Sequence, residues 1–218
     1  MAKLYLGTRE VTPTILQQRY GVNVENFLGS TNANGVLLQP SGNFDVSFDG
    51  VTDVQQRALS NKFNYTKVKN VNFPDLIALS GNYACFCAFY GCSLVSVSFP
   101  KLATVSGTQA MGQIFENSGL QTITFPALTT ISGNNAMNRA FGYLNIRDIY
   151  FPALTTNSFP TYTTQFSGMF SGSGSSSNTI NVHFPSNLQS TIANLTGYPN
   201  FGGTAGYINL LFDLEATE

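Results

Sequence analysis

The sequence predicts an α/β solenoid in which repeats of about 26 residues, each a strand, a turn and a short helix, stack to form a parallel sheet on one face. Three observations support this fold class. One dipeptide recurs at a fixed interval, and apolar residues recur in register between its copies. Within each repeat, apolar residues first recur at every second position, as in a strand, and then at the spacing of one face of a helix.

The recurring dipeptide is Phe-Pro, and its first three intervals are all 26 residues. The fourth interval is 33 residues, and it includes a Gly- and Ser-rich run from Gly172 to Ser177 that is typical of a flexible surface loop. The copies are Phe73-Pro74, Phe99-Pro100, Phe125-Pro126, Phe151-Pro152 and Phe184-Pro185.

Apolar residues hold the same register between these copies, so we expect each set to form one buried column. The clearest columns are Leu76, Leu102, Leu128 and Leu154, then Phe89, Phe115 and Phe141, then Val97, Ile123 and Ile149. When the same register is extended towards the N-terminus, the matching positions predict a degraded repeat before the first clear one. Its apolar residues are Ala58, Phe63, Val68 and Val71. One repeat cannot bury its apolar face alone, whereas stacked copies can.

A strand is predicted directly before each Phe-Pro dipeptide. Residues 95–99 and 121–125 alternate polar and apolar side chains, which indicates a strand with one buried face. The proline that follows has no N–H to donate to a sheet, and therefore ends the strand.

A short helix is predicted after each Ser-Gly pair. From Ser80 to Phe89 the apolar residues Ala84, Cys85 and Ala88 have the spacing of one helix face, and Ser80 is placed to act as the N-cap. The chain then divides into an N-terminal attachment or capping segment (1–50), the solenoid (51–200) and a C-terminal cap or tail (201–218).

The composition of the chain excludes several classes of function. Only 10% of the residues are charged and the net charge is −1. Such a chain has no electrostatic attraction to nucleic acid, which excludes non-specific nucleic-acid binding as a main function. The first ten residues lack the apolar core of a signal peptide, and no apolar run is long enough to span a membrane. Three cysteines within eight residues do not form a disulfide framework.

The repeat resembles the BspA-like class of leucine-rich repeats. The resemblance rests on the Leu-x-x-Val-x-Phe-Pro-x-Leu pattern of residues 94–102, followed by Ser-Gly-x-x-Ala, and it covers about two thirds of the chain. Residues 184–192 also resemble the closing segment of such arrays, where the last repeat becomes a capping helix. The resemblance implies adhesion and recognition at surfaces and does not imply a reaction. No cofactor is expected.

The first 16 residues are similar to the start of virion proteins from tailed phages of gut bacteria. This similarity implies a protein assembled in the host cytoplasm and carried on the virion, attached to other virion proteins through its N-terminal segment, and homo-oligomeric. The docking partner of that segment is the first repeat, a sister subunit or another virion protein. Its candidate attachment residues are Leu4, Tyr5, Leu6, Val11, Ile15 and Leu16.

The candidate binding face is the exposed side of the sheet, where the residues flanking each buried strand position point outward. Hydroxyls and amides with an aromatic residue at one end suit a cell-surface saccharide or a polar protein surface. The alternative is that Ser and Thr are simply soluble strand formers on a solvated face. The residues are Asn70, Asn72, Ser96, Ser98, Thr122, Thr124, Asp148, Tyr150, Asn181 and His183.

Neither a metal site nor a catalytic site is expected. Cys85 shares its repeat position with Met111 and Met137, which makes it a core residue, and a structural zinc site needs four ligands. His183 has Asp148 one strand away on the same face, but no nucleophile motif accompanies the two.

We therefore expect a non-enzymatic phage virion component, a head or tail appendage, that displays a repeat surface for adhesion or recognition. The first alternative is a BspA-like adhesin domain at a bacterial cell surface. The second alternative is a carbohydrate-active enzyme on a parallel β-helix. The helical spacing in every repeat and the lack of clustered acidic residues argue against that enzyme.

Overall fold

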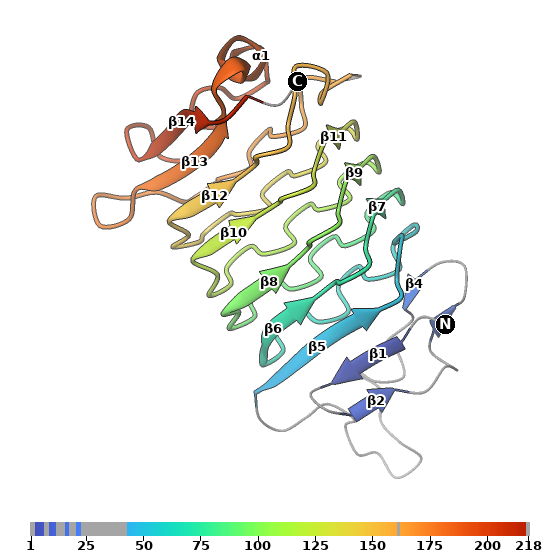
Figure 1. The fold of residues 1–218 in the computed structure, drawn as a ribbon. Helices are drawn as coiled ribbons and strands as arrows, with labels where there is room; N and C mark the ends of the chain where they lie inside the picture. Colours follow the sequence, from blue (N-terminus) through green and yellow to red (C-terminus); the bar gives the residue numbers. More distant parts are fainter. Residues whose placement is uncertain are drawn as a thin grey trace.

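The chain folds into a solenoid of parallel strands. The computed structural model describes residues 3–6, 9–11, 16–17, 21–22, 43–160 and 162–216. Successive coils stack along one axis, from the blue N-terminal end to the red C-terminal end (Figure 1). The Phe-Pro dipeptides line up along this stack, because the rings of their phenylalanines stack on one another from coil to coil.

The long face of the solenoid carries one strand from each coil. In order these are β5 (Phe44–Asp49), β6 (Val68–Asn72), β8 (Ser96–Ser98), β10 (Thr122–Thr124), β12 (Asp148–Tyr150), β13 (Ile180–Pro185) and β14 (Ile208–Leu214). A second, narrow parallel sheet joins β7 (Ala78–Leu79), β9 (Thr104–Val105) and β11 (Thr130–Ile131). The predicted parallel sheet is therefore confirmed.

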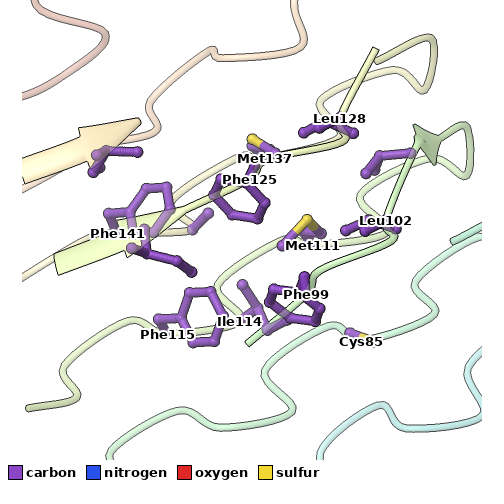
Figure 2. Close-up of a cluster of buried hydrophobic side chains, with 14 of the residues drawn as sticks. Cys85, Phe99, Leu102, Met111, Ile114, Phe115, Phe125, Leu128, Met137 and Phe141 are labelled. Carbon is purple, nitrogen blue, oxygen red and sulfur yellow. The ribbon is translucent and has the colours of Figure 1, made fainter. Parts of the chain in front are cut away.

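The predicted columns are the core. The Leu column is fully buried, and phenylalanine rings stack from coil to coil in two ladders (Figure 2). On the strand side the rings of Phe48, Phe73, Phe99, Phe125, Phe151, Phe184 and Phe212 have neighbouring centroids 4.3 to 5.9 Å apart. On the opposite side Phe63, Phe89, Phe115, Phe141 and Phe170 are spaced by 5.4 to 6.4 Å. Offset aromatic pairs stabilise by about 0.5–1.5 kcal/mol each beyond the area they bury.

The predicted repeat helices are wrong. Residues 82–91, and the equivalent segments of the next coils, form consecutive turns. The N–H groups of alternate residues close turns within their own coil; for example, Ala84 N–H donates to Gly81 O. The N–H groups of the residues between them donate to the next coil; for example, Cys85 N–H donates to Ala110 O. Every fourth residue has a positive φ, which no α-helix contains, among them Tyr83, Cys87 and Gly91.

Pairing of the coils on both sides accounts for this difference. Neighbouring turns hydrogen-bond to one another, so this side of the coils keeps a spacing close to that of parallel strands, about 4.8 Å, whereas α-helices about 10 Å wide would hold the coils apart here. Turns pair with their neighbours at the strand spacing, and they place Ala84, Cys85, Ala88 and Phe89 on one buried side, as a helix would. The apolar spacing therefore predicts the correct core residues and the wrong backbone.

Helical structure among the described residues follows the last Phe-Pro dipeptide. A 3-10 turn (Ser186–Leu188) leads into α1 (Gln189–Ala193), with Leu188 and Ile192 buried, and the chain then returns to the sheet as β14. The 33-residue interval between the last two Phe-Pro dipeptides has extra residues both before and after Phe170. Phe170 follows Phe141 by 29 positions rather than 26, so part of the extra length precedes Phe170 and the rest follows it. Ser173 of the Gly-Ser run is buried, and its Oγ donates to Phe141 O.

The N-terminal end of the sheet is closed by antiparallel strands. β1 (Lys3–Leu6) pairs with β5 and with β2 (Arg9–Val11), while β3 (Leu16–Gln17) pairs with β4 (Gly21–Val22). Of the candidate attachment residues, Leu4, Tyr5 and Leu6 therefore lie on a strand joined to the first coil, and Ile15 lies outside the described residues. None of the helices in the described part of the chain is long and apolar enough to cross a membrane.

Candidate binding face

The ten residues of the candidate binding face lie on five strands in two parallel columns. Asn70 is in register with Ser96, and Asn72 with Ser98. Thr122, Asp148 and Asn181 continue the first column, and Thr124, Tyr150 and His183 continue the second. The four hydroxyl residues of β8 and β10 are exposed, whereas the residues of β12 and β13 are half-buried.

Side-chain hydrogen bonds run along the first column at both ends. Ser96 Oγ donates to Asn70 Oδ1 over 2.7 Å, and Asn70 Nδ2 donates to Asp45 Oδ1 over 2.7 Å. At the other end Asn209 Nδ2 donates to Asn181 Oδ1, and Asn181 Nδ2 donates to Asp148 Oδ1. Thr122 lies between these two chains, and no described residue hydrogen-bonds its hydroxyl. The amides at the ends are therefore already engaged within the protein.

The second column ends in a cluster around His183. The rings of Tyr150 and His183 are stacked with centroids 4.3 Å apart, and His183 Nδ1 lies 2.9 Å from Asp213 Oδ2 on β14. Asp148 Oδ1 is 3.6 Å from Nε2, which is buried without a hydrogen-bond partner. This arrangement holds the imidazole in place, and it does not present Nε2 to a ligand.

The sheet is interrupted at the centre of the candidate binding face. No backbone pair joins β8 to β10 in the described chain, although every other pair of successive strands on this face is bonded. Phe73 and Phe125 donate their N–H groups to the next strand, and Phe99 has no equivalent bond. On the opposite side the same two coils remain paired, as Phe115 N–H donates to Ala140 O. The interruption is therefore local to the long face.

A groove of about 320 Å³ lies along this interruption, and we call it the central groove. The hydroxyls of the four exposed Ser and Thr residues rim it, and Val97 and Ile123 form its apolar floor with two prolines. Val97 is half-buried, although its column was expected to be core throughout. The residues of the central groove are Ser96, Val97, Ser98, Phe99, Pro100, Thr122, Ile123, Thr124 and Pro126.

Sequence reasoning did not include the strands that flank the ten residues. Asp45 on β5 and Asn209 on β14 extend the first column, and Asp213 supports His183. A faint signal was present, since Ile208 and Phe212 repeat the apolar positions of Ile180 and Phe184. The unpaired strands of the central groove left no signal in the sequence.

Two of the three cysteines belong to the core. Cys85 and Cys92 are buried, and burial raises the pKa of both thiols. Cys87 is half-buried, and burial together with the nearby Glu116 carboxylate raises its pKa to about 11. Among the described residues, no three His, Cys, Asp or Glu side chains are placed to share a metal ion.

Comparison with known proteins adds no relative. No family model matches the chain, and no significant match was found among curated proteins or solved structures.

Proposed function

We propose that this chain is a non-enzymatic recognition module that binds a cell-surface glycan in the central groove. Its repeat is of the BspA-like leucine-rich class, with turns in place of the helical layer. Its setting is a tailed-phage virion, in which it forms a head or tail appendage assembled in the host cytoplasm. The N-terminal similarity to virion proteins supports that setting.

The observation that carries this proposal is the interruption between β8 and β10. Backbone polar groups that would otherwise pair are left open there, beside the hydroxyls of Ser98, Thr122 and Thr124. Unpaired polar groups at a groove favour a ligand that supplies hydrogen bonds. A sugar supplies hydroxyls along its edge and C–H groups on its face, which fit the rim and the floor of Val97 and Ile123. The volume is at the lower end of the range of about 300–1,000 Å³ for ligand sites.

A glycan array probed with the purified chain tests this proposal. Thr122→Val and Thr124→Val together remove two hydroxyls while keeping shape and strand propensity. We expect a loss of affinity of about 5- to 150-fold for the responsive glycans, since each hydrogen bond contributes about 0.5–1.5 kcal/mol. Thr179→Val, an exposed threonine directly before β13, is the matched control. Binding to no glycan, or equal binding by the double variant and the control, would refute the proposal.

The virion setting is tested separately. Quantitative mass spectrometry of purified particles is expected to find the chain at a fixed copy number. Its presence in the bacterial envelope without infection would favour the alternative, a BspA-like adhesin at the bacterial surface.

A carbohydrate-cleaving solenoid is the second candidate, because the cluster of Asp148, His183 and Asp213 places two carboxylates beside an imidazole. The lack of repeat helices also removes one argument against it. The covered Nε2 of His183 argues against a general base. Release of reducing ends from a polysaccharide, lost in His183→Ala, would favour the enzyme over the binding module.

A further inference from the structure

The two ends of the sheet differ. At the N-terminal end β1 runs antiparallel to β5 and closes the parallel stack. At the C-terminal end β14 pairs with β13 on one side, and no described strand lies on its other side (Figure 1). An open strand edge with unpaired N–H and C=O groups is a ready site for pairing with another chain.

The core is also open at this end. The inward residues Val182 and Phe184 of β13 are fully buried, whereas Ile208, Leu210 and Phe212 of β14 are only half-buried. Phe212 is the last ring of the strand-side ladder, with Phe184 stacked on one face at 5.8 Å. The strand contains neither lysine nor proline, and Asp213 is its one charged residue, so its edge is weakly protected against pairing.

We propose that β14 pairs antiparallel with β14 of a second copy of this chain, across a two-fold axis through Leu211, and so joins two solenoids into one continuous sheet. An isologous pair of this kind uses the same surface on both copies. The inference is independent of the proposed glycan site, because the central groove lies on other coils.

The sequence of β14 is complementary to itself about Leu211. In this register Leu210 of one copy lies opposite Phe212 of the other, and both side chains face inward, so the two cores become continuous. Asn209 lies opposite Asp213 on the outer face, where an amide N–H can donate to a carboxylate oxygen. Ile208 lies opposite Leu214 at the ends. Every pair therefore matches an apolar residue with an apolar one, or a donor with an acceptor.

The backbone supports the same register. Ile180 N–H donates to Tyr207 O, so Tyr207, Asn209 and Leu211 face β13. Because alternate residues of a strand point their N–H and C=O groups to opposite sides, those of Ile208 and Leu210 face the open edge. The pairing with β13 is regular from Ile208 to Leu211 and shifts by one residue between Leu211 and Leu214. In the proposed register Leu210 therefore enters a hydrogen-bonded pair from the regular part of β14.

Sedimentation velocity of the full chain tests this inference. We expect the wild type to sediment with twice the mass of the single chain. Leu211→Lys places two ammonium groups together at the two-fold axis, and is expected to give the mass of one chain with an unchanged circular dichroism spectrum. Ile77→Lys, at an exposed apolar residue whose backbone is hydrogen-bonded to both neighbouring coils, is the matched control and is expected to remain dimeric. A monomeric wild type, or a dimer that persists in Leu211→Lys, would overturn the proposal.

A cross-link fixes the register without weakening the strand. Leu211→Cys in a Cys87→Ser background brings two thiols together in a non-hydrogen-bonded pair, where Cα atoms lie about 4.5 Å apart, within disulfide range. Mild oxidation is expected to give a covalent dimer that dithiothreitol reverses. Ile77→Cys in the same background is the control and should remain uncross-linked. A dimer that Leu211→Cys fails to cross-link would show that another surface pairs the chains.

Discussion

The amide of Gln165 is fully buried and has no hydrogen-bond partner in the described structure. Its column holds Ala84, Ala110 and Ala136 in the preceding coils, so a polar side chain stands at an apolar position. Gln165→Met keeps the volume and removes the unpaired amide. We expect the free energy of unfolding to rise by about 1–3 kcal/mol. Urea unfolding measures it, with exposed Gln189→Met as the control, and a destabilised Gln165→Met would show that the amide is satisfied in solution.

The thiol of Cys87 should react slowly although it is half-exposed. Burial first, and the Glu116 carboxylate second, raise its pKa from 9.0 to about 11. A raised thiol pKa lowers the thiolate fraction, and the thiolate is the reacting species. At pH 8 we expect Cys87 to react with a disulfide reagent about 100-fold more slowly than an unperturbed thiol, since two pKa units change that fraction about 100-fold. Stopped-flow absorbance checks this, with the urea-unfolded chain as the control, and equal rates for the two states would contradict it.

Residue-level prediction succeeded for the Leu and Phe columns and failed for Val97 and for contacts between unlike coils. The Leu and Phe columns are buried as their 26-residue spacing requires, because each copy meets the same neighbours. Asp213 was not assigned to the site, since it supports His183 from a strand outside the clear repeats. Contacts between unlike coils carry no periodic signal.

At the scale of the element, Ser106 and Gly107 distinguish a turn from a helix. A Cβ atom on Gly107 would lie 2.0 Å from Gly81 O of the preceding coil, so only glycine fits there. Ser106 is exposed and caps no helix. We expect Gly107→Ala to lower the free energy of unfolding by about 3 kcal/mol or more, since the coils must separate, and Ser106→Ala to change it by less than about 0.5 kcal/mol.

Thermal and urea unfolding of these two variants measure the difference. If the segment were a helix capped by Ser106, its alanine variant would lose about 1 kcal/mol. A loss of that size in Ser106→Ala, with a tolerated Gly107→Ala, would contradict the stacked turns. Apolar spacing alone could not decide between the two backbones, because both bury Ala110 and Phe115 on the same side. The close approach at Gly107 depends on the neighbouring coil, which local sequence does not describe.

At the scale of the whole molecule, each coil contacts its neighbours along one axis, so one coil should be removable. Deletion of residues 100–125 joins Phe99 directly to Pro126 and restores the Phe-Pro dipeptide in register. In stacked repeats, stability is close to a sum of repeat and neighbour contributions. The shortened chain is therefore expected to fold and to unfold cooperatively. Its urea m-value should fall by about 12%, in proportion to the 26 of 218 residues removed.

Deletion of residues 100–112 is the matched control, because it removes half a coil and puts strands against turns. We expect that variant to lose the cooperative transition, since the Phe ladders no longer align. The full-coil deletion also removes β10 and with it the central groove, so it should fold and yet bind none of the glycans bound by the wild type. An unfolded product from the full-coil deletion would show that stability depends on contacts between distant coils, and retained glycan binding would place the ligand elsewhere on the sheet.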